Sequence, residues 1–242
     1  KYVGEYRVKV GDNAHNTPLL IRLTSPEGIE FSDDTHSITI VSEDAITVDD
    51  DGEADFTSIQ AAVDAVKDGD TILVAAGNYA EHIEINKNIN LIGAGADATQ
   101  IESTDDYSTV LVTDVADVFI KGFTIIYNGN DEYSASLWIS GSQITVSENI
   151  ITGTGGGIRC KNDSIVTITE NQIYENKQYG IALDSSQGEI FSNTIQKNEK
   201  FGIFALFGSQ ITQLMDNRII ANKGTGIYLE KSNVESFVNN TI

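Results

Sequence analysis

The chain of 242 residues carries 36 acidic and 15 basic side chains, a formal net charge of −21. Because nucleic-acid binding needs a basic surface, this balance argues against nucleic acid as a partner. It also disfavours unaided binding of a polyanionic sugar, whereas a neutral glycan meets no such repulsion. No run of 18 apolar residues occurs, so the sequence predicts no membrane span. The single cysteine, Cys160, allows no intrachain disulfide and is expected to point into the core.

Charge is distributed unevenly along the chain. Residues 1–150 hold 27 acidic and 7 basic side chains, whereas residues 151–242 hold 9 and 8. The acidic half begins with a β-rich flanking segment, residues 1–44. Three strand-like runs lie within it, at Tyr6–Val10, Leu19–Leu23 and Ser37–Val41. Both a small β-sandwich remnant and an elaborated cap on the following domain are compatible with these runs.

An acidic run follows at residues 49–55. Its carboxylate side chains are Asp49, Asp50, Asp51, Glu53 and Asp55. Oxygen ligands of this kind suit Ca²⁺, so the run is a candidate calcium site, although its spacing is not that of an EF-hand loop. The alternative is a solvated acidic turn, because runs of like charge usually face water.

A helix is predicted over residues 57–67. Thr57 and Gln60 have the spacing of a capping box, in which the Thr57 hydroxyl caps the first turn and Gln60 reaches back. The apolar residues Ile59, Ala62, Val63 and Val66 then form one helical face. We expect this helix to cover the end of the coils that follow, since an open end exposes apolar core and strand edge.

The rest of the chain repeats with a period of 22–24 residues. One series consists of Asn149, Asn171, Asn193, Asn217 and Asn240. A second consists of Gly157, Gly180, Gly202 and Gly226, each followed by isoleucine. A third consists of Asn128, Asn176, Asn198 and Asn222, with Thr154 in the missing place. Short runs of alternating polarity lie between these residues, as half-buried strands do. Three series sharing one period predict stacked coils of β-structure.

The repeats also assign structural roles. The stacked asparagines are expected to hydrogen-bond to one another and to the corner backbone, because buried polar groups need partners. Gly and Asn are expected to supply the left-handed backbone of tight corners. Regular coils are predicted over about 118–242, with Phe123 in the asparagine position of the first, and Ile89–Gly93 belongs to the coil before it. The break at Ile242 falls in mid-coil, so we expect the coils to continue.

Four motifs between Phe56 and Ile101 carry a family resemblance. They are Phe56–Ala62, Gly69–Ile72, Gly77–Glu81 and Leu91–Gly95. This layout resembles the start of pectin-lyase-like proteins, among them pectin methylesterases and NosD-like parallel β-helix repeat proteins. The resemblance implies an all-β, right-handed parallel β-helix over residues 45–242, with an N-terminal capping α-helix. It does not specify an activity, because one fold hosts many functions.

The sequence offers few candidate residues for an enzymatic reaction. In pectin methylesterases a Gln and an Asp of two conserved strings build the active site, and the matching stretches here, Ala135–Ile139 and Thr154–Ile158, lack both. A methylesterase is therefore not expected. A polysaccharide lyase or epimerase acting on a uronate would need a base and a cation, for which Arg159 and Lys161 are the candidates. The alternative for both is an exposed charge on a coil.

A column of outward residues is the most suggestive feature for binding. If the isoleucine after each glycine points inward, the next residue points outward. These residues are Trp138, Arg159, Ala182, Phe204 and Tyr228, and Tyr179 and Phe201 flank the same edge. Stacked aromatic rings on a sheet face can lie against sugar rings. The alternative is that a loop, a C-terminal region or a partner subunit covers the column.

These observations favour a secreted, cell-surface or periplasmic module that binds carbohydrate or acts structurally or in adhesion. Two alternatives stay open. The first is a lyase or epimerase acting on a uronate-containing glycan. The second is a self-assembling surface protein in which the aromatic column is a contact between copies. A cofactor is not expected, with Ca²⁺ at the acidic run left open.

Overall fold

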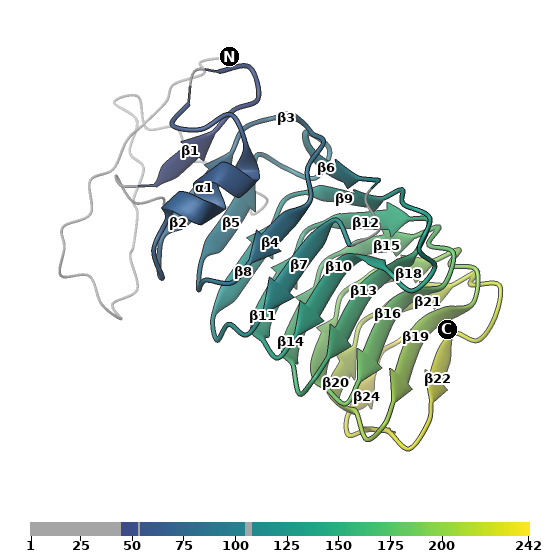
Figure 1. The fold of residues 1–242 in the computed structure, drawn as a ribbon. Helices are drawn as coiled ribbons and strands as arrows, with labels where there is room; N and C mark the ends of the chain where they lie inside the picture. Colours follow the sequence, from purple (N-terminus) through teal and green to yellow (C-terminus); the bar gives the residue numbers. More distant parts are fainter. Residues whose placement is uncertain (1–44, 53, 105–107) are drawn as a thin grey trace, which may run out of the picture. The chain divides into compact units, whose positions relative to one another are not determined.

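The computed structural model describes residues 45–52, 54–104 and 108–242 (Figure 1). The strand-like runs predicted before residue 45 lie outside the described residues. In the described part, parallel strands coil through three long sheets, and one short helix lies beside the first strands. The prediction of an all-β parallel solenoid is confirmed. No helix of the described residues is long and apolar enough to cross a membrane.

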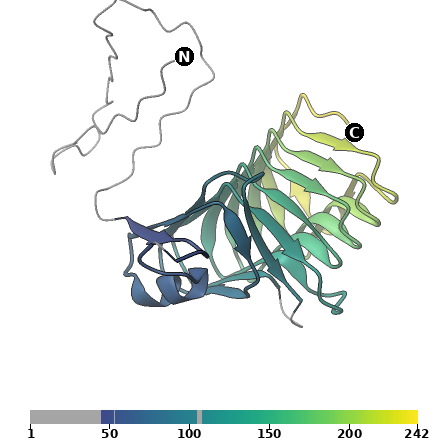
Figure 2. The ribbon, with the colours of Figure 1, turned by 90° about the horizontal axis from the view of Figure 1, so that it is seen from above.

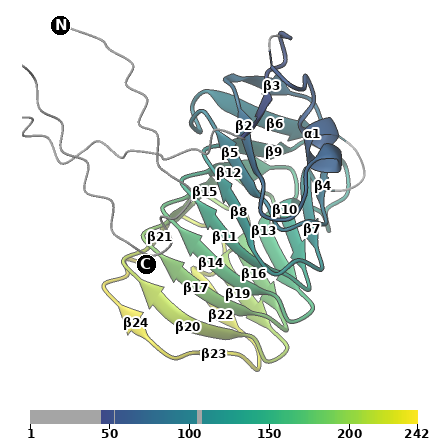
Figure 3. The same ribbon diagram turned by 90° about the vertical axis from the view of Figure 1, so that its left-hand side faces the viewer.

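The first sheet has ten strands over the described residues, and all pair in parallel. In spatial order they are β1 (Ile46–Val48), β2 (Thr71–Val74), β5 (Asn90–Gly93), β8 (Val118–Lys121), β11 (Gln143–Ser147), β14 (Ile165–Thr169), β17 (Gln187–Phe191), β20 (Gln210–Met215) and β23 (Asn233–Val234), with β24 (Phe237–Val238) also beside β20. Figure 3 shows the strands of this sheet side by side from β2 to β23 and β24.

The other two sheets each have seven strands in the described part of the chain. The second sheet contains β3 (Gly77–Tyr79), β6 (Thr99–Ser103), β9 (Thr124–Tyr127), β12 (Ile150–Gly153), β15 (Gln172–Tyr174), β18 (Thr194–Gln196) and β21 (Arg218–Ile220). The third sheet contains β4 (Ile83–Ile85), β7 (Val110–Thr113), β10 (Ala135–Ser140), β13 (Gly156–Lys161), β16 (Tyr179–Asp184), β19 (Phe201–Leu206) and β22 (Ile227–Leu229). From β2 to β22 each coil therefore gives one strand to each sheet, whereas β23 and β24 both lie in the first sheet.

The core consists of side chains stacked in register from coil to coil. In the second sheet one such stack is Ile125, Ile151, Ile173, Ile195 and Ile219. Each is at most 1% exposed. Burying an isoleucine side chain stabilises the fold by about 1.5–3 kcal/mol, so every added coil extends the same apolar column.

A ladder of asparagines lies at the corner between the first and second sheets. Each side-chain amide donates to the Oδ1 of the next asparagine, at 3.2 Å from Asn149 to Asn171 and 3.0 Å from Asn171 to Asn193. Each backbone amide donates to the same oxygen, at 2.9 Å in both steps. Phe123 takes the first position, because its backbone amide donates to Asn149 Oδ1 at 3.0 Å. The predicted ladder and the place of Phe123 are both confirmed.

Most of the left-handed residues at these corners are not of the types we expected. The residue before each asparagine has φ between 53° and 58°. These residues are Glu148, Glu170, Ser192, Asp216 and Asn239. The asparagine contributes hydrogen bonds, and its predecessor carries the strained backbone. The expectation that Gly and Asn supply the left-handed corners was therefore wrong at Glu148, Glu170, Ser192 and Asp216, whereas Asn239 and Gly122, which precedes Phe123, follow it.

A second ladder, Asn176, Asn198 and Asn222, follows the second sheet. Asn176 donates to Asn198 Oδ1 at 2.8 Å, and Asn198 donates to Asn222 Oδ1 at 2.9 Å. Asn128 does not join it, because its side chain donates to the Glu102 carboxylate at 2.7 Å. The second ladder therefore begins at Asn176, because the preceding position holds Thr154 and not an asparagine. The buried Asn176 Oδ1 lacks a hydrogen-bond partner in the described part of the chain.

The helix α1 (Ile59–Ala65) lies against the end of the stack that carries β1 and β2 (Figure 2). It is shorter than predicted, and Ser58, not Thr57, is its N-cap, accepting from Ala61 N. The Glu81 carboxylate supplies the remaining cap by accepting from Ile59 N at 2.9 Å and from Gln60 N at 3.0 Å. The predicted capping box was wrong because this distant carboxylate satisfies the first-turn amides.

Candidate functional site

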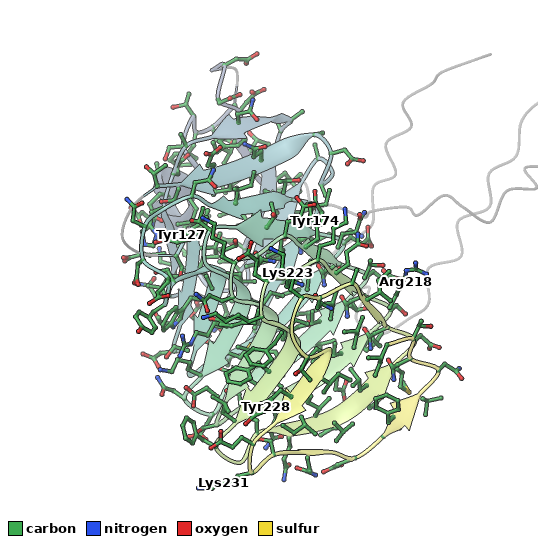
Figure 4. The ribbon with its side chains drawn as sticks, turned by 90° about the vertical axis from the view of Figure 1, so that its right-hand side faces the viewer. Tyr127, Tyr174, Arg218, Lys223, Tyr228 and Lys231 are labelled. Atoms are coloured by element: carbon green, nitrogen blue, oxygen red, sulfur yellow. The ribbon has the colours of Figure 1, made fainter. Side chains whose placement is uncertain are left out.

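The predicted outward column exists on the third sheet. Trp138 pairs with Arg159, Arg159 with Ala182, Ala182 with Phe204, and Phe204 with Tyr228. The preceding isoleucines Ile158, Ile181 and Ile203 are fully buried, so the alternation predicted from the sequence holds. Figure 4 labels Tyr228 of β22 at the C-terminal end of this column, and Tyr174 and Arg218 of the second sheet away from it.

Three aromatic rings gather at the C-terminal end of the column. Phe201 and Phe204 stack with their ring centroids 4.6 Å apart, and Tyr228 lies 5.5 Å from each of them. Tyr228 is 39% exposed, and the two phenylalanines are half-buried. The three residues, called here the aromatic cluster, form an apolar surface that faces water.

Cations cover the tryptophan at the other end. The Arg159 guanidinium lies 4.9 Å and the Lys161 ammonium 5.7 Å from the centroid of the Trp138 ring. Asp184 lies 3.9 Å from Arg159 and 3.6 Å from Lys161. Cation–π contacts and shared ion pairs hold this group together. The two candidate catalytic residues are thus brought together, and one carboxylate pairs with both.

Tyr179 lies deeper than we expected. It is 8% exposed, because its ring lies over Gly156, where an added Cβ would be 2.2 Å from Tyr179 Cε2. Burial raises the pKa of Tyr179 to about 12, while the Arg159 guanidinium acts in the opposite direction. Tyr179 Oη and Arg159 Nε are both shielded from water, and neither forms a hydrogen bond of good geometry among the described residues, although the guanidinium lies close enough to the hydroxyl to lower its pKa.

A depression of about 50 Å³ lies between the two ends of the column. Ala182 forms its floor, Arg159 and Phe204 stand on the neighbouring strands, and Tyr179 and Asp184 lie on the same strand as Ala182. It exists because Ala182 is small and its neighbours in the column are large. Asp184 was not among the predicted site residues, although it lies two residues after Ala182 on the same face of a strand.

The candidate calcium ligands point to separate partners. Asp55 accepts from the Thr47 hydroxyl at 2.7 Å and from its amide at 2.9 Å, and these hydrogen bonds lower the pKa of Asp55. Asp50 accepts from Asn78 N at 3.2 Å, and Asp49 accepts from Asp51 N at 3.4 Å. Glu53 lies outside the described residues. Within the described ranges, no three His, Cys, Asp or Glu residues gather as a metal site.

Cys160 is fully buried in β13, as its predicted place in the core requires. Burial in this apolar setting raises the pKa of the Cys160 thiol far above its ordinary value. The thiolate is therefore disfavoured, and the residue acts as a small apolar side chain of the core.

Comparison with known proteins gives the same architecture. The model of the right handed beta helix region matches residues 108–242. A cell surface glycoprotein of Methanothermus fervidus is 33% identical over an alignment of 159 residues, which covers 62% of this chain and 26% of that protein. The chain thus spans about a quarter of its curated relative.

Solved structures support the fold alone. A pectin methylesterase variant in complex with a hexasaccharide superposes with a TM-score of 0.56 and 11% identity, over 80% of this chain and 68% of that one. The pectin methylesterase of Erwinia chrysanthemi gives 0.51 and 12%, over 82% and 81%.

Proposed function

This chain belongs to the right handed beta helix family, and we propose that it is a cell-surface module that binds a glycan along its third sheet. The relationship to a cell surface glycoprotein supports the location, at the cell surface or outside the cell. The observation that carries the proposed binding is the aromatic cluster, Phe201, Phe204 and Tyr228, exposed in line with the depression over Ala182.

Aromatic rings on a regular sheet suit a polymer of sugar rings. A sugar ring has one apolar face of C–H groups, which packs against an aromatic ring while the hydroxyls stay hydrated. Neighbouring strands of a sheet lie about 4.8 Å apart, so successive coils offer contacts along a chain. The net charge of −21 supports a neutral glycan over a polyanion.

Within this proposal, α1 has a structural role as a cover for the N-terminal end of the coils. Ile59, Ala62 and Val63 are buried and belong to the same core cluster as the strand residues. The fold then presents the third sheet as a rigid surface, because each coil is held by those on either side.

The alternative of a lyase or epimerase has less support. Arg159 and Lys161 both lie beside Asp184, so this carboxylate compensates cations that would otherwise neutralise a uronate. Self-assembly would use the same exposed aromatic cluster as a contact between copies. The test below distinguishes it from glycan binding.

A glycan array tests the proposed binding. We expect the protein to bind a neutral polysaccharide, and we expect Tyr228→Ala to weaken that binding about fivefold, because the lost ring contact is worth about 1 kcal/mol. Trp138→Ala should have a smaller effect, because Arg159 and Lys161 already lie over the ring. Tyr174→Ala, on β15 of the second sheet, is the matched control and should leave affinity unchanged.

Two results would contradict the proposal. One is that no glycan binds. The other is that Tyr174→Ala and Tyr228→Ala weaken binding equally. If light scattering then gives a dimer that Tyr228→Ala converts to a monomer, the aromatic cluster is a contact between copies.

A further inference from the structure

The depression over Ala182 has the size of a small substituent, not of a whole sugar ring. Its volume is about 50 Å³. A water molecule needs about 10–15 Å³ of such space, so the depression has room for a substituent larger than one water molecule. The flanking Arg159 and Phe204 side chains, one coil away on either side, confine that group over Ala182.

The walls offer three kinds of contact. Ala182, Phe204 and Leu206 are apolar. Arg159 Nε and Tyr179 Oη are hydrogen-bond donors that lack a protein partner among the described residues. The Asp184 carboxylate accepts hydrogen bonds and pairs with its two cations only at 3.6 and 3.9 Å. A buried donor without a partner is unfavourable, so a ligand that supplies an acceptor is favoured.

We infer that this depression takes the acetamido group of an N-acetylated hexosamine, so that the preferred ligand is a polymer containing that sugar. This inference rests on the proposed glycan binding. The group has four heavy atoms, and its methyl, carbonyl and N–H each have a complementary contact in the depression. Its methyl contacts the apolar floor, its carbonyl oxygen accepts from Arg159 or Tyr179, and its N–H donates to Asp184. A plain hydroxyl lacks the methyl, and a carboxylate would add a second negative charge beside Asp184.

Entry of the group requires Arg159 to shift, because its Nε and the Tyr179 hydroxyl are shielded from water. The contacts that hold the guanidinium are weak enough to allow this. They are a 3.3 Å hydrogen bond to the Tyr133 carbonyl, a long ion pair with Asp184 and the cation–π contact with Trp138. None of them is a short bidentate pair, which would be the strong arrangement for arginine.

Two oligosaccharides that differ in the substituent at C2 test the inference. Chitohexaose carries acetamido groups, and cellohexaose carries hydroxyls on the same β-1,4-linked backbone. By calorimetry, chitohexaose should bind at least about tenfold more tightly. Tyr179→Phe should reduce that preference several-fold by weakening chitohexaose alone. Ala182→Leu, which fills the depression, should abolish it. Tyr174→Phe is the control and should preserve it.

The melting temperature separates these effects from misfolding. Tyr179→Phe removes a hydroxyl without a partner, so it should not lower the melting temperature. Equal affinity for the two oligosaccharides, or a preference that survives Ala182→Leu, overturns the inference while the proposed glycan binding stands. Failure of both oligosaccharides and of the whole glycan array overturns both.

Discussion

Asn193→Ala is expected to lower the free energy of unfolding by about 3–5 kcal/mol, because it breaks five hydrogen bonds of a buried network. Its amide donates to Ile168 O at 2.8 Å, to Phe191 O at 3.0 Å and to Asn217 Oδ1 at 3.0 Å. Its Oδ1 accepts from the backbone and side-chain amides of Asn171 at 2.9 and 3.0 Å. Alanine removes the acceptor of the buried Asn171 backbone amide, whereas Asn217 Oδ1 still accepts from the backbone amide of residue 193 at 3.0 Å.

Asn233→Ala is the matched control. Asn233 is exposed on β23, and its side chain forms no hydrogen bond within the described part of the chain. The same substitution should change stability there by no more than about 0.5 kcal/mol. Urea denaturation of the parent and both variants measures the difference. Equal stability of the two variants would show that the ladder contributes no more than an exposed amide.

Gly157→Ala is expected to destabilise the protein by about 1–3 kcal/mol or more, because the coils leave no room for a methyl group. An added Cβ would lie 2.4 Å from Gly180 O and 2.9 Å from Ile173 Cγ2. The first contact is with backbone of the next coil, so it is relieved only if the two coils move apart. The glycine series is thus explained by close approach and not by a left-handed backbone, since Gly157, Gly180 and Gly202 are absent from the described positive-φ residues.

Gly188→Ala in β17 is the control for this second prediction. Its added Cβ would lie 3.2 Å from Leu183 Cδ1, the end of a side chain that can turn away. We expect a smaller loss of stability, below about 1 kcal/mol. Thermal denaturation of both variants provides the comparison. Should Gly157→Ala melt at the same temperature as the parent, the tight stacking of the coils would be refuted.

The repeats predicted the fold because equivalent residues of every coil pack in the same way. Residues at one spacing occupy one column, so the asparagine ladder, the buried isoleucines and the outward face follow from the period. The period gives no information about contacts between residues of different columns. Glu81 caps α1 from 22 residues beyond Ile59, and no local pattern indicates this.

The candidate site shows the same division. Alternation along β10, β13, β16 and β19 correctly placed Trp138, Arg159 and Phe204 on the outer face. It could not show that the Tyr179 ring is buried over Gly156, because this burial depends on the absence of a side chain at Gly156 in the neighbouring coil. Nor could it show that Arg159 and Lys161 share Asp184 and lie over Trp138, which depends on where long side chains turn.

Fluorescence of Trp138 tests the glycan-binding face most directly, because this is the only tryptophan among the 242 residues and it lies in the outward column. Titration with a bound glycan should change its emission in a saturable way. Tyr228→Ala should move the midpoint to higher concentration, and Tyr174→Ala should leave it in place. A glycan that binds tightly without changing the emission of Trp138, or with a midpoint that Tyr228→Ala does not move, would place the binding site elsewhere on the molecule.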